Sequence, residues 1–66
     1  MKRVRFEELK IGDTFKIEYG DYGNWVDATL IGIKDIPNYP HIKMIAYEYN
    51  GRVFTDRQII TDFVEV

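Results

Sequence analysis

The sequence predicts a small all-β protein, a five-stranded barrel formed by one domain over residues 1–66. Three observations predict it. Short runs of β-branched and aromatic residues are separated by glycine, proline and asparagine, which is the pattern of strands and turns. Asn50-Gly51 lies between two such runs and favours the type I′ turn of a two-residue hairpin. Gly32 interrupts an apolar run, as a bulge or bend at a barrel corner does.

The predicted elements follow one another closely along the chain. Phe15, Ile17 and Tyr19 alternate with polar residues, which indicates a half-buried strand. The Asn50-Gly51 turn sets a register that pairs Tyr47 with Phe54 and Tyr49 with Arg52. In order, we expect a helical turn or loop lid at 6–10, strands at 13–19 and 25–34 around a turn at 20–24, a loop at 35–41, strands at 42–49 and 52–56, a tight or 3-10 turn at 56–60, and a fifth strand at 61–66. An open meander with a short N-terminal helix is the alternative architecture.

Composition narrows the class of protein. The chain has no cysteine, so disulfides and thiolate metal sites are excluded and an intracellular location is favoured. The first residues are charged where a signal peptide needs an apolar stretch. No apolar run approaches the roughly 20 residues of a membrane span. We therefore expect a soluble, cytoplasmic protein.

Side chains that carry catalysis are scarce. The chain has no serine and no cysteine, which excludes Ser–His–Asp and Cys–His nucleophiles. Its one histidine, His41, follows Pro40 in the predicted loop, where a solvated side chain is the ordinary case. Neither a zinc spacing nor a glycine-rich phosphate loop is present. We expect no enzymatic activity, no metal and no cofactor; a site shared between subunits is the only catalytic alternative.

Several short motifs occur together over residues 10–60. They are Lys10-Ile11-Gly12-Asp13 entering a strand, Tyr19 at its end, Asp21-x-Gly23 in the turn, Ala28-Thr29-Leu30-Ile31-x-Ile33, and Tyr47-x-Tyr49-Asn50-Gly51. This arrangement resembles the Tudor family of SH3-like small barrels, and the KOW and chromo-barrel types share much of it. The resemblance implies a binding module with an aromatic cage for methylated lysine or arginine. By position, that cage would use Tyr19, Tyr47 and Tyr49, with Asn50 beside them. Where the family often has an aromatic residue in its second strand, this chain has Val26, and Trp25 comes one residue earlier.

Aromatic and acidic residues gather at one end of the predicted fold. In a five-stranded meander, the turns after the first and third strands lie at the same end. The candidate ligand-binding residues flanking them are Tyr19, Asp21, Tyr22, Trp25, Tyr47, Tyr49 and Asn50. Aromatic faces attract cations by about 0.5–2 kcal/mol, so we expect a protein or peptide partner with basic or methylated side chains. In the competing interpretation, Tyr19 and Tyr47 pack in the core.

Two other functions are compatible with the sequence. The first is a nucleic-acid module in which aromatic rings stack on bases and Lys2, Arg3, Arg5, Lys16 and Arg52 contact phosphates. The net charge of −2 weighs against it, and the three N-terminal cations also suit a solubilising tail. The second is a small viral or mobile-element accessory protein that binds and inhibits a host protein. Apolar residues on both faces of 30–33 and 42–46 suit either a monomer or a homodimer.

Overall fold

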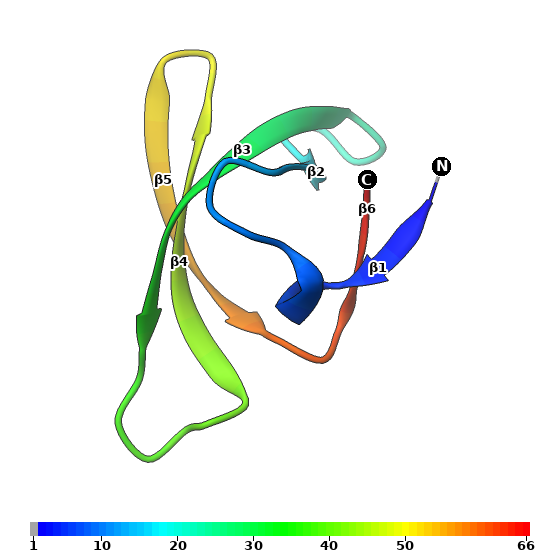
Figure 1. Ribbon diagram of the computed structural model, residues 1–66. Coiled ribbons are helices and arrows are strands. Elements are labelled where there is room, and N and C mark those ends of the chain that lie inside the picture. Colours follow the sequence, from blue (N-terminus) through cyan, green and yellow to red (C-terminus); the bar gives the residue numbers. More distant parts are fainter. Residues whose placement is uncertain (1) are drawn as a thin grey trace.

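The computed structural model describes residues 2–66 and confirms the all-β class (Figure 1). Its elements are β1 (Arg3–Arg5), the 3-10 turn η1 (Phe6–Glu8), β2 (Thr14–Glu18), β3 (Trp25–Asp35), β4 (Ile42–Tyr49), β5 (Arg52–Ile59) and β6 (Phe63–Glu65). The four strands β2-β3-β4-β5 form one antiparallel sheet in that order, and β1 pairs with β6 in a second. Both ends of the chain therefore lie side by side, as Figure 1 shows.

The closed five-stranded barrel is not formed by residues 2–66. Six strands divide between two sheets, and no strand belongs to both. The sixth strand is β1, which covers part of the predicted basic tail. Val4 is half-buried between exposed Arg3 and Arg5, and it pairs with Val64 at the other end of the chain. Three residues with a partner so distant in sequence carry almost no local strand signal, which explains why this strand was missed.

The central hairpin confirms the register expected from Asn50-Gly51. Tyr47 pairs with Phe54 and Tyr49 with Arg52, and both turn residues have positive φ angles, 54° at Asn50 and 75° at Gly51. The turn predicted at 56–60 is wrong, because β5 runs on to Ile59. The beginning of β4 supplies partners for these residues, so the ladder continues, and the chain turns only at 60–62 before a shorter last strand.

Gly32 marks the predicted bulge. Leu30 pairs with Tyr47 but Gly32 pairs with Ala46, so Ile31 is an extra residue on β3. An ideal Cβ on Gly32 would lie 3.5 Å from the Cβ of Ala46, which is ordinary contact. The bulge therefore changes which face each side chain occupies along β3, since one extra residue reverses the alternation.

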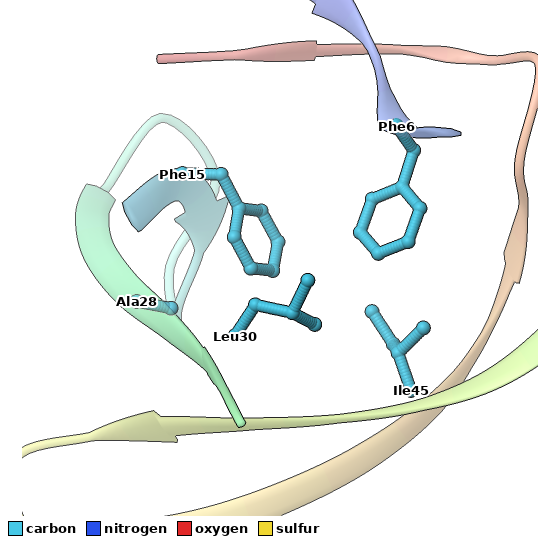
Figure 2. Packing of buried hydrophobic residues seen from close by; sticks show 5 residues of the cluster. All are labelled: Phe6, Phe15, Ala28, Leu30 and Ile45. Atoms are coloured by element: carbon cyan, nitrogen blue, oxygen red, sulfur yellow. The ribbon is translucent and has the colours of Figure 1, made fainter. Parts of the chain in front are cut away.

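Five side chains from four elements form the buried core: Phe6, Phe15, Ala28, Leu30 and Ile45 (Figure 2). Phe6 closes this core from η1. Its backbone N–H donates to the carbonyl of Asp62 at 2.9 Å, and the N–H of Glu7 donates to the carbonyl of Ile60 at 2.9 Å. These two bonds attach η1 to the segment between β5 and β6, so the predicted lid is held in place by the residues that precede the last strand.

Strand β5 forms one edge of the four-stranded sheet. Because Tyr49 and Arg52 close a two-residue hairpin, alternate residues of β5 point their backbone groups away from β4. Two of these outward groups are bonded by the strand's own side chains. The Asp56 carboxylate accepts from the N–H of Arg57 at 2.8 Å, and the Gln58 amide donates to the carbonyl of Ile59 at 3.0 Å. The second half of this edge is thus partly satisfied without a neighbouring strand.

Candidate ligand-binding surface

A row of six contacting aromatic rings runs from the core to the hairpin end of the sheet. In order of contact, this aromatic row is Phe6, Phe15, Tyr47, Phe54, Tyr19 and Tyr49. The first two contacts are edge-to-face with ring centroids 5.9 Å apart, and Tyr47 stacks on Phe54 at 5.7 Å. The row ends at Tyr19 and Tyr49, whose centroids are 4.9 Å apart with the planes tilted by 54°. Such tilted and edge-to-face pairs add about 0.5–1.5 kcal/mol each beyond the area they bury.

Strand alternation explains why these rings meet. Phe15 and Ile17 on β2 point toward the core, and Tyr19 continues the same face just after the strand ends. Tyr47 and Tyr49 share the face of buried Ile45 on β4. Tyr19 follows one edge strand of the sheet, and Phe54 lies on the other edge strand, yet their rings are 5.7 Å apart. The two edges are therefore brought together by side chains and not by a hydrogen-bonded ladder.

The structure brings three of the predicted ligand residues into this row and leaves others apart. Tyr19, Tyr47 and Tyr49 belong to it, all half-buried. Trp25 does not, because Val26 and Ala28 point inward and alternation puts Trp25 on the opposite face of β3. Tyr22 is 99% exposed at the tip of the turn between β2 and β3. The five predicted aromatic residues therefore do not surround one space.

The polar candidates have structural partners at the same end. The turn after β2 is closed by a hydrogen bond from the Tyr19 N–H to the Asn24 carbonyl at 3.0 Å. Glu18 accepts from the Gly23 N–H at 2.9 Å, and the Asp21 carbonyl accepts from the Asn24 N–H at 3.1 Å. Within residues 2–66 the Asp21 carboxylate forms no ion pair. Asn50 occupies the hairpin turn, so its backbone role explains its presence without a ligand.

Two cavities among the described residues lie away from the outer end of the aromatic row. One of about 250 Å³ is lined by Ile36, Tyr39, Ile42 and Arg57 beside the loop between β3 and β4. Another, of about 340 Å³, opens between η1 and the inner side of the sheet. The rings of Tyr19 and Tyr49 line neither of these two cavities.

The basic residues proposed for nucleic acid are spread over several elements. Arg3 and Arg5 lie on β1 with guanidinium carbons 5.4 and 5.7 Å from the ring centre of Phe63, and Arg3 also approaches Glu65 at 3.5 Å. Lys2 directly precedes β1 and so adjoins them. The other two lie on different strands: Lys16 pairs with Asp27 at 2.5 Å across β2 and β3, and Arg52 lies at the start of β5. The two arginines therefore lie on a strand, with their side chains over the ring of Phe63.

Phe54 belongs to the aromatic row but was not among the predicted ligand-binding residues. It contacts both Tyr19 and Tyr47 and so connects the core to the outer pair. The signal was available, because the hairpin register already paired Phe54 with Tyr47. Side chains alternate between the two faces of a strand, so the pattern over residues 25–30 also predicts that Trp25 faces away from the tyrosines.

The surroundings of Tyr47 perturb the ionisation of its hydroxyl. Burial raises the pKa of its hydroxyl above the usual value of 10.0, and the negative charge of Asp56 raises it further. The folded state therefore keeps this proton at a pH where the unfolded chain has lost it. The stability from this group is complete below about pH 10 and is lost as the pH rises through the raised folded pKa.

We expect the free energy of unfolding to fall with increasing pH above about 10, and Tyr47→Phe to flatten that decline. Urea denaturation at a series of alkaline pH values measures the slope. Tyr39→Phe, in the loop between β3 and β4, is the control for the loss of one hydroxyl. An alkaline slope in Tyr47→Phe equal to that of the wild type would contradict the assignment.

Comparison with known proteins adds no relative: no family model, curated protein or solved structure matches this chain. Within residues 2–66, no three histidine or acidic side chains are grouped so that they could hold a metal ion. No helix in the part of the chain described is long and apolar enough to cross a membrane.

Proposed function

We propose that the domain is a non-catalytic interaction module that binds a basic side chain of a protein or peptide at the Tyr19–Tyr49 pair. The observation that carries this proposal is that pair itself, two half-buried rings with centroids 4.9 Å apart at the end of the aromatic row. Asp21, without an ion pair in residues 2–66, adds attraction for a cation at the same end.

The form of the surface favours arginine over trimethylated lysine within this class. A guanidinium is planar and stacks on an exposed ring face, whereas a quaternary ammonium gains most when several rings enclose it. Trp25 faces away, so two rings offer a stacking surface and not a cage. We further propose a relationship to the SH3-like barrels of the Tudor type, supported by the curved antiparallel sheet (Figure 1), the bulge at Gly32 and the Asn50-Gly51 hairpin.

Titration with an arginine-rich peptide, followed by NMR shifts of the tyrosine side chains, tests the binding. Tyr49→Ala should weaken affinity by roughly two- to fivefold, equivalent to about 0.5–1 kcal/mol for an exposed cation–π contact. Tyr49→Phe keeps the ring and should bind as the wild type does. Equal affinities of Tyr49→Ala and the wild type would refute the site. An inhibitor of a host protein would use the same surface, and capture of one stoichiometric partner would identify it.

A further inference from the structure

The face of β3, β4 and β5 turned away from the core carries an ordered arrangement of side chains that the proposed function does not use. We call this the outer face. Three cross-strand rows define it, each with one residue from each strand. They are Lys34, Met44 and Arg57; Gly32, Ala46 and Thr55; and Thr29, Glu48 and Val53. The first is the cationic row, the second the small row and the third the Glu48 row.

The outer face exposes several large apolar side chains, more than is usual for a sheet face in contact with water. Ile31, Val53 and Ile59 are 40%, 59% and 44% exposed, and half-buried Met44 and Ala46 lie between them. The small row has no side chain larger than threonine and none at all at Gly32. It is therefore a shallow strip across the sheet where a second surface can approach closely.

The charges on either side of the small row are opposite in sign and lack partners. Lys34 and Arg57 flank Met44 in the cationic row, while Glu48 is central in the row two residues further along β4. Within residues 2–66, ion pairs join other residues and none of these three. Two cations therefore lie on one side of the small row and an anion on the other. A second copy rotated by 180° about the small row presents the opposite charge at each of these positions.

We propose that the outer face pairs with the outer face of a second copy of this chain, about a two-fold axis that follows the small row. Such an axis reverses the strand direction, so the cationic row of each copy lies opposite the Glu48 row of the other. Met44 and Glu48 each lie about 7 Å from Ala46 along the strand. A sheet-to-sheet angle of about 30° displaces them sideways by only about 3–4 Å. Lysine and arginine side chains span that displacement across sheets about 10 Å apart.

Reversing charges on one partner and then on the other tests this pairing. Sedimentation equilibrium of the wild type should show a dimer. Glu48→Lys, and separately Lys34→Glu combined with Arg57→Glu, should each weaken dimerisation more than about tenfold, because like charges then face one another. An equimolar mixture of the two variants should form a heterodimer, which restored complementarity alone explains.

Glu7→Lys is the matched control, since it makes the same charge change on η1, away from the outer face. It should dimerise as the wild type does. A wild type that stays monomeric to about millimolar concentration overturns the pairing. So does a dimer that neither charge-reversed variant weakens, or a mixture that does not form the heterodimer. Tyr49 is on the opposite face, so Tyr49→Ala should weaken peptide binding and leave the dimer intact, and the two proposals can fail separately.

Discussion

Phe6→Ala is expected to be strongly destabilising, by about 3–5 kcal/mol at 25 °C. Phe6 is 1% exposed and, with Leu30, is one of the largest fully buried side chains. Truncating a buried phenylalanine costs about 3–5 kcal/mol. Domains have roughly 0.05–0.15 kcal/mol of stability per residue, about 3–10 kcal/mol for 66 residues, so the loss takes from about a third to all of it. Circular dichroism during urea denaturation measures the change.

Phe63→Ala is the matched control for this prediction. Phe63 is 55% exposed on β6 and contacts Arg3 and Arg5 through its ring face. Its loss should cost about 1 kcal/mol or less, as most surface substitutions do. Similar losses in the two variants would mean that η1 does not close the core as described.

The second large effect concerns two neighbours on β3. Leu30→Ala should destabilise by about 2–5 kcal/mol, whereas Ile31→Ala should cost about 1 kcal/mol or less. The reason is the bulge, which keeps Leu30 completely buried and leaves Ile31, the extra residue, 40% exposed. Thermal or urea unfolding of both variants gives the comparison. The opposite order of stabilities would show that the strand is shifted by one residue.

The features of the fold that came from local chemistry were predicted well. Asn50-Gly51 takes positive φ at both positions, and this local preference alone fixed the register of β4 and β5. Gly32 likewise gave the bulge. Features that depend on distant partners were not predicted. β1 exists because Val4 meets Val64, and β5 extends to Ile59 because Ile42 pairs with it.

Part of the candidate site could be predicted from the order of the turns and the alternation of side chains along strands, and part could not. Placing Tyr19 and Tyr49 at the same end needed only the order of the turns, and their shared face followed from alternation. Trp25 was predicted to join them because it lies at the same end of the sheet, but its side chain is on the opposite face. Alternation from Ala28 would have separated it from them. Contact between the rings of Tyr19 and Phe54 depends on how far the sheet bends, which the sequence pattern does not encode.

The hydrogen bonds that side chains of β5 form with its own backbone affect whether further copies can add to this edge of the sheet. Strands that add to an open sheet edge leave a new edge behind them, so growth by that route has no natural limit. Asp56 and Gln58 occupy backbone groups that an incoming strand would need. Two outer faces that meet about a two-fold axis cover each other and leave nothing to extend. The side chains of β5 therefore discourage fibre-like addition at this edge, and the proposed pairing of outer faces would stop at two copies.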